Sequence, residues 1–156
     1  MEKIRGFEAV VEEMRKGTMD YILPVRGSSK SAGYDISSPI DVVIEPHSSV
    51  LVWTNIKAYM LQDEVLEVYI RSSSAIKRNL MLKNLVGIID ADYYSNTGND
   101  GNIGVCLYNM SDEVVVIEKG QRICQGIFKK YLIADDDVCL KNERTGGVGS
   151  TGVSNN

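Results

Sequence analysis

Short apolar runs separated by turn residues are the feature that most constrains how this chain can fold. They extend from about Tyr21 to Tyr131 and are too short for buried helices. Gly, Asn, Asp, Ser and Pro bound them, which is typical of β-strands. Many short strands in succession indicate an all-β sandwich or barrel. Strands are predicted over residues 41–45, 49–60, 65–71, 85–90, 103–109, 113–118 and 123–131.

Two segments show helical spacing instead. Phe7, Val10, Val11 and Met14 recur on one face of a helix that would end near Gly17. This spacing predicts an N-terminal helical extension over residues 1–19 that packs on the body. A second, shorter pattern predicts a helix over residues 74–82.

Length and charge limit the class of protein. A chain of 156 residues predicts a single domain, residues 1–156. Its 17 basic and 21 acidic residues give a net charge of −4, which argues against nonspecific nucleic-acid binding. No apolar run has the length of a membrane span. Three cysteines without metal-ligand spacing indicate a reducing compartment, and the N-terminus lacks the apolar core of a signal peptide. We therefore expect a soluble cytoplasmic protein with no membrane partner.

Five motifs stand out from this background. In GIIDADY (residues 87–93) an apolar run ends in Asp90, and Asp92 and Tyr93 follow. A carboxylate at the end of a buried strand can orient a water molecule, although Asp is also common as a turn cap. The other motifs are AGYDI (32–36), RSSSA (71–75), GQRICQ (120–125) and RTGGVGSTG (144–152).

The RSSSA motif contains residue types that commonly bind anions. Arginine presents a planar fork for phosphate oxygens, and serine hydroxyls with backbone amides at a helix start complete such a site. An ordinary helix N-cap beside a surface arginine has the same residues. The glycine-rich motif at 144–152 lacks the lysine of a Walker-type phosphate loop.

In this order, the five motifs resemble those of the trimeric dUTPases, over about residues 20–152. The resemblance implies a distorted, jelly-roll-like β-barrel and a homotrimer with shared active sites. It also implies Mg²⁺-dependent hydrolysis of dUTP to dUMP and pyrophosphate. Such a reaction limits uracil in DNA and supplies the precursor of dTMP.

The resemblance also implies a role for individual residues. Asp90 would orient the attacking water, and Tyr93 would lie against the deoxyribose and exclude a 2′-hydroxyl. Asn84 would bind uracil together with the backbone of neighbouring residues. Phosphate binding falls mainly to Arg71, Ser72 and Gln125. The remaining predicted substrate contacts are Ser73, Gly87, Ile88, Ile89 and Gly104.

The C-terminal tail resembles an arm that closes over the bound nucleotide. Residues 143–156 are rich in glycine and are expected to be mobile. Arg144 would meet the γ-phosphate, and Val148 stands where family members usually carry an aromatic ring that stacks on uracil. We therefore expect a weaker closed state. The other predicted contacts of the arm are Gly149, Ser150 and Thr151.

Mg²⁺ is the expected cofactor, held mainly by the substrate phosphates because this ion keeps most of its water. Asp35 would contact it indirectly, through water.

Two alternatives remain open at this point. A dCTP deaminase of the same fold has a similar RSS motif but needs a glutamate proton shuttle in its base pocket. A regulatory role is the second, with a protein partner bound by the N-terminal helix or by the loop of residues 94–102. That loop is several residues longer than the usual tight turn of the family, which leaves the register of the base pocket open by a residue or two.

Overall fold

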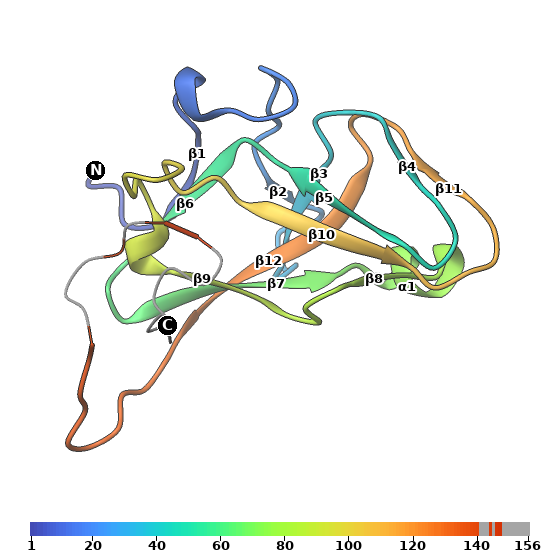
Figure 1. The fold of residues 1–156 in the computed structure, drawn as a ribbon. Helices are drawn as coiled ribbons and strands as arrows, with labels where there is room; N and C mark the ends of the chain where they lie inside the picture. Colours follow the sequence, from blue (N-terminus) through green and yellow to red (C-terminus); the bar gives the residue numbers. More distant parts are fainter. Residues whose placement is uncertain (141–143, 145, 148–156) are drawn as a thin grey trace, which may run out of the picture.

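Antiparallel strands form most of the fold, as the sequence predicted (Figure 1). A computed structural model describes residues 1–140, 144, 146 and 147. The strands are β1 (Gly6–Ala9), β2 (Val25–Arg26), β3 (Tyr34–Ser37), β4 (Val42–Ile44), β5 (Ser49–Trp53), β6 (Ile56–Tyr59), β7 (Glu64–Ile70), β8 (Leu80–Leu82), β9 (Gly87–Asp90), β10 (Gly104–Asn109), β11 (Val115–Ile117) and β12 (Arg122–Lys130).

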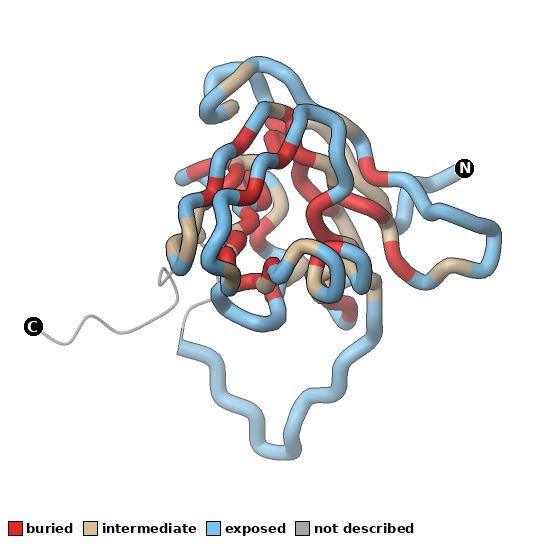
Figure 2. The backbone as a smooth tube through the Cα atoms, turned by 90° about the vertical axis from the view of Figure 1, so that its right-hand side faces the viewer, coloured by how far each residue is buried: buried red, intermediate tan, exposed pale blue. Residues whose placement is uncertain are grey.

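These strands form four open sheets around one apolar core. The largest has the order β2-β3-β12-β7-β9, and a second has the order β5-β10-β8. Two pairs, β1-β6 and β4-β11, complete the fold. The all-β class is confirmed, but among the described residues the hydrogen-bonded ladders do not close into the barrel that we expected. Burial is concentrated where the sheets face one another (Figure 2), at residues such as Ile36, Val52, Leu66, Leu107 and Ile117.

The predicted N-terminal helix is wrong. Residues 6–9 form strand β1, which pairs antiparallel with β6, and only a single 3-10 turn follows at Glu12–Met14. Phe7 lies 5.4 Å from the ring of Tyr34 and 5.3 Å from that of Phe128, measured between centroids. The local spacing favoured a helix, but pairing with a strand about 50 residues away decides the conformation, and no local pattern reports such a partner.

Two asparagines with positive φ end elements that the sequence predicted to continue. Asn55 (φ 57°) is fully buried and divides the predicted strand 49–60 into β5 and β6. Asn79 (φ 53°) ends the helix α1, which spans Ser72–Arg78 rather than residues 74–82. The chain then continues as β8 alongside β10. Asparagine tolerates this left-handed conformation better than most residues, so both breaks fall at side chains that permit them.

Residues 131–140, after β12, extend away from the sheets (orange-red in Figure 1). All ten are exposed, including the apolar side chains of Leu132, Ile133, Val138 and Leu140. Exposed apolar side chains close together often mark a surface that another chain covers. Among the described residues, no helix has the length and apolar character needed to cross a membrane.

The long loop of residues 94–102 is built into the body by a buried ion pair. Lys57 Nζ on β6 lies 2.9 Å and 3.0 Å from the two carboxylate oxygens of Asp100. The lysine side chain is 8% exposed and the aspartate side chain 12%. The backbone N–H of Val11 also donates to Asp100, at 2.8 Å. Three distant parts of the chain therefore meet at one carboxylate.

Replacing Lys57 with Met should destabilise the protein by about 3–5 kcal/mol, because it leaves the Asp100 carboxylate buried without its partner. Urea unfolding monitored by circular dichroism measures this loss. Lys130→Met is the matched control. Its ion pair with Asp63 is 3.1 Å long but has exposed side chains (71% and 54%), so the expected loss is below about 1 kcal/mol. Equal losses for the two variants would contradict the argument.

Candidate active site

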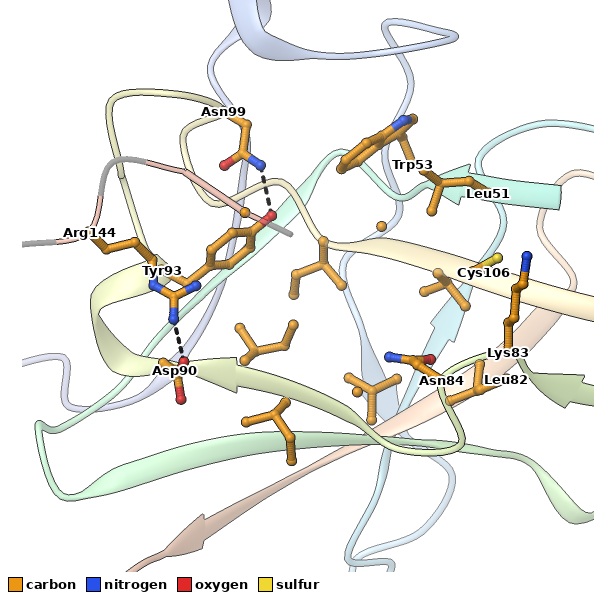
Figure 3. A pocket seen from close by; sticks show the side chains of 18 residues that line it. Leu51, Trp53, Leu82, Lys83, Asn84, Asp90, Tyr93, Asn99, Cys106 and Arg144 are labelled. Carbon is orange, nitrogen blue, oxygen red and sulfur yellow. Dashed lines mark hydrogen bonds and ion pairs between the residues drawn. The ribbon is translucent and has the colours of Figure 1, made fainter. Parts of the chain in front are cut away.

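A pocket of about 690 Å³ lies between β5, β9 and β10 (Figure 3). Leu51 and Trp53 from β5 border one side, and Leu82, Lys83 and Asn84 border another. Tyr93, Asp90 and Arg144 form the third. Eight residues predicted from the sequence line this pocket: Asn84, Gly87, Ile88, Ile89, Asp90, Tyr93, Gly104 and Arg144.

Within the part of the chain that the structure describes, two strand edges without a strand partner face this pocket. β9 is the edge strand of the five-stranded sheet, where it pairs only with β7. β8 pairs with β10 from Leu107 to Asn109, and the Lys83 N–H donates to the Cys106 carbonyl at 2.9 Å, so Gly104 and Val105 are the part of β10 without a described strand on that edge. Such edges present backbone donors and acceptors in a row. A flat heterocycle with alternating acceptor and donor atoms has the complementary chemistry.

Asp90 is the last residue of β9 and its side chain is about half exposed. A guanidinium nitrogen of Arg144, Nη2, donates to Asp90 Oδ2, and Arg144 Nε donates to Asp92 Oδ1 at 2.9 Å. Asp92 therefore binds Arg144 as well. We expected Arg144 to bind the γ-phosphate of the substrate. In this single chain, its guanidinium instead lies between the carboxylates of Asp90 and Asp92.

Tyr93 is the aromatic side of the pocket. It ends the 3-10 turn η2 (Ala91–Tyr93) and is only 8% exposed. Its hydroxyl donates to the backbone carbonyl of Asn102 at 2.5 Å and accepts from Asn99 Nδ2 at 2.8 Å. Burial raises the pKa of Tyr93 above its ordinary value, while the Asn99 hydrogen bond and Arg144 oppose that shift. The phenol is thus neutral at physiological pH and acts through its shape and hydrogen bonds.

Trp53 was not predicted from the sequence. This residue is the only tryptophan of the chain and it pairs with Gly104 across the β5–β10 ladder. A Cβ atom on Gly104 would lie 3.0 Å from the indole ring, so glycine lets the ring lie across the neighbouring strand. Lys16 Nζ lies 4.1 Å from the ring centroid. An indole of the same chain therefore lies close to Gly104, which we predicted as a substrate contact, and only the pairing of β5 with β10 reveals this approach.

Asn99 was missed as well, and here the sequence held a signal. Asn96, Asn99 and Asn102 recur at intervals of three in the long loop. Asparagine side chains commonly bind nearby backbone groups in turns. All three are buried, and Asn99 lines the pocket.

A second cluster contains other predicted residues. Asp35 on β3 accepts from Arg71 Nε at 2.9 Å and from Arg122 Nη1 at 3.3 Å. Gln125 lies over Gly33, where a Cβ atom would come within 2.3 Å of its amide oxygen. Two guanidiniums around one carboxylate leave a positive surplus, which suits a phosphate. Ser72 and Ser73 are exposed at the start of α1, beside this cluster.

The register of β7 keeps this cluster apart from the pocket. Val65 on β7 is opposite Asp90, whereas Arg71 follows the other end of the same strand. Six residues of extended chain separate the two positions, or about 20 Å. Figure 1 shows the same separation, with α1 and the turn after β9 at opposite ends of β7. One chain cannot bring Asp90 and Arg71 to the same phosphate group.

Four predicted residues of the arm, Val148, Gly149, Ser150 and Thr151, lie outside the described residues. The predictions for them stay untested, as does the predicted mobility of the arm. Among the residues that the structure does describe, no three His, Cys, Asp or Glu side chains gather as metal ligands. Both oxygens of Asp35 accept hydrogen bonds from arginine, which fits contact with a metal through water better than direct ligation.

Comparison with known proteins agrees with this geometry. A family model described as dUTPase matches residues 20–152. The chain is 48% identical over 152 residues to the deoxyuridine 5'-triphosphate nucleotidohydrolase of Lactococcus lactis, covering 97% of this chain and 99% of that protein.

Solved structures agree as well. The crystal structure of the dUTPase from Streptococcus mutans superposes with a TM-score of 0.74 at 41% identity, over 83% of this chain and 98% of that one. A dUTPase mutant from phage phi11 of S. aureus, whose structure is described as revealing a structural Mg(II) ion, has a TM-score of 0.68. It is 19% identical over 90% of this chain and 99% of that one, so its likeness shows the fold alone. The match over residues 20–152 and the identity across nearly the whole chain establish that this chain belongs to the dUTPase family.

Proposed function

We propose that this protein hydrolyses dUTP to dUMP and pyrophosphate in a pocket between β9 and β10. The observation that carries the proposal is the arrangement of Asp90, Tyr93 and two open strand edges around one cavity of nucleotide size. The names of the relatives support the same substrate. The reaction removes dUTP before it enters DNA and supplies dUMP for dTMP synthesis.

Asp90 orients the water that attacks the α-phosphate. Its side chain is about half exposed, so it reaches solvent while β9 fixes its backbone. A carboxylate in this position can accept a proton from the attacking water. Arg144 already lies on that carboxylate, which places a cation next to the point where the phosphate charge would arrive.

Selectivity for base and sugar comes from opposite sides of the pocket. Uracil presents an acceptor, a donor and another acceptor along one edge, which suits the open backbone edges of residues 87–90 and 104–105 and the amide of Asn84. Cytosine would leave buried groups unpaired. The buried ring of Tyr93 leaves no space for a 2′-hydroxyl.

A homotrimer completes the site in this proposal. Because about 20 Å of β7 separates Asp90 from Arg71, the phosphate-binding group of Arg71, Ser72, Ser73 and Gln125 belongs to the pocket of a neighbouring copy. The exposed apolar side chains of residues 131–140 supply a surface that such a neighbour can cover.

Mg²⁺ is the proposed cofactor, and the cytoplasm is the proposed location. The chemistry that Mg²⁺ supplies when bound is neutralisation of the substrate phosphates. Membership of the dUTPase family supports this ion, and the phage phi11 dUTPase is described with a structural Mg(II) ion. Asp35 would reach it through water, since two arginines already occupy its oxygens. Cys106 and Cys124 are unbridged thiols, which suits a reducing compartment.

The alternatives gain no support. Among the described residues that line the pocket there is no glutamate, which a deaminase of this fold would need as a proton shuttle. The predicted docking helix is a strand paired with β6, and four residues of the loop 94–102 contribute buried side chains to the body. Neither observation favours a regulatory partner at these segments.

Asp90→Asn should lower kcat for dUTP by about 10²–10⁴-fold, because the amide cannot accept the proton of the attacking water. Pyrophosphate release in the presence of Mg²⁺ measures the effect. Asp92→Asn is the matched control, since Asp92 binds the same arginine but does not line the pocket. We expect it to lower kcat less than tenfold. An equal loss in both variants would assign the effect to Arg144 rather than to Asp90.

Mixing two inactive variants tests the shared site. Asp90→Asn and Arg71→Gln homotrimers should each be inactive, and joint refolding should restore part of the activity, because mixed trimers contain pockets with an intact Asp90 from one chain and an intact Arg71 from another. Light scattering should give three times the chain mass for the wild type. No restored activity in mixed trimers would place both residues in one subunit's site.

Binding of dUMP should change the fluorescence of Trp53, because the partly buried indole borders the pocket and is the only tryptophan present. The change should saturate with dUMP and be smaller with dCMP and UMP at equal concentration. Trp53→Phe should abolish the signal. An unchanged emission during saturating, measured binding would remove Trp53 from the binding pocket.

A further inference from the structure

We propose that Asn99 is a positioning residue for sugar selectivity, and that the long loop of residues 94–102 exists to hold its amide against Tyr93. The inference rests on the proposed function, in which the Tyr93 ring excludes the 2′-hydroxyl. It explains why this chain carries a long loop where the family motif needs only a short turn.

The Tyr93 hydroxyl is held from two sides by this loop. It donates to the carbonyl of Asn102 at 2.5 Å. It also accepts from Asn99 Nδ2 at 2.8 Å (Figure 3). Both partners come from the loop that follows the tyrosine along the chain. A phenol that both donates and accepts has its ring fixed at the far end, whereas the backbone alone fixes only the near end.

The orientation of the Asn99 amide is itself determined. Its oxygen accepts from Asn96 Nδ2 at 2.7 Å and from the backbone N–H of Gly101 at 3.0 Å. With two donors on the oxygen, the nitrogen must point to the tyrosine. Asn96 also donates to the backbone carbonyl of Tyr93, at 2.7 Å. Asn96 therefore binds the backbone of Tyr93, and Asn99 binds its hydroxyl.

The loop that carries Asn99 is fixed at its far end. Asp100 forms the buried ion pair with Lys57, and Asn102 Oδ1 accepts from the backbone N–H of Asn55 at 3.0 Å. Gly101 has φ 84°, and a Cβ atom there would come within 2.8 Å of the Tyr93 carbonyl. The loop therefore packs tightly against Tyr93, and the phenol ring has little freedom to move.

The C-terminal arm meets the same pair of side chains. A Cβ atom on Gly147 would lie 3.3 Å from Asn99 Nδ2 and 3.4 Å from the Tyr93 hydroxyl. Arg144 lies 5.7 Å from the centre of the Tyr93 ring. A ring held by the loop offers a fixed surface to the arm, and a ring free to tilt would not.

This arrangement predicts an effect on the discrimination between dUTP and UTP rather than on folding. Without the Asn99 amide, the hydroxyl keeps only one partner and the ring can tilt away from the sugar. The tilted ring would leave space for the 2′-hydroxyl of UTP, so UTP would bind more readily. dUTP has no 2′-hydroxyl and gains nothing from that space. The ratio of kcat/KM for dUTP to that for UTP is the quantity that separates a positioning role from a merely structural one.

Four variants test the inference: Asn99→Ala, Tyr93→Phe, the double variant, and Thr97→Ala as the control. Thr97 is exposed in the same loop. We expect Asn99→Ala to lower the dUTP-to-UTP ratio roughly five- to tenfold, the size of one net hydrogen bond. Tyr93→Phe should lower it similarly. Adding Asn99→Ala to Tyr93→Phe should change it little further, because the shared hydroxyl is already gone. Thr97→Ala should leave it unchanged.

The outcomes separate the two proposals. If Asn99→Ala lowers the melting temperature but keeps the ratio, the loop is only structural and the inference is wrong. If Asn99→Ala does not fold, Tyr93→Phe still decides, since an unchanged ratio without the hydroxyl would overturn the role of its hydrogen bonds. Effects that add fully in the double variant would also overturn it. Failure of the wild type to hydrolyse dUTP would refute the proposed function itself.

Discussion

The register between β7 and its neighbours is the constraint on which the site depends. β7 lies between β12 and β9 in the largest sheet, so it fixes the positions of both at once. It places Asp90 opposite Val65 at one end and leaves Arg71 at the other. A shift of one residue would turn every side chain of β9 to the opposite face. The same ladder that builds the pocket thus separates Asp90 from the arginine cluster around Asp35, and the proposed site therefore needs more than one chain.

Buried polar side chains perform the second task of fixing the irregular segments. Lys57, Asn55, Asn102 and Asp100 connect β6, the N-terminal segment and the long loop at one place. Within the described residues, every buried side-chain nitrogen and oxygen has a hydrogen-bond partner. A satisfied polar network specifies one conformation, because each displaced group would lose its partner in a medium of low polarity. A loop rich in asparagine and glycine is therefore ordered, and it holds the aromatic side of the pocket.

The pocket joins residues that are distant in sequence. Trp53 reaches it across Gly104 because β5 and β10 pair, and Asp90 and Tyr93 reach it because β9 ends where the turn η2 begins. Arg144 closes over two carboxylates of this group. Burial of Tyr93 raises the pKa of the phenol and keeps it neutral. In the proposed function, shape and backbone edges therefore carry selectivity, and the charged groups stand at the side where phosphates would arrive.

The sequence by itself determined the all-β class, most of the long strands, and eight residues that line the pocket, because short apolar runs and the motif around Asp90 are local patterns. Only the tertiary structure decided that residues 6–9 form a strand, that Asn55 divides a predicted strand, and that the sheets stay open. It also decided the place of Trp53. Each of these depends on a partner far along the chain, either a strand edge or a buried hydrogen bond. Spacing within a segment carries no information about which distant segment will meet it.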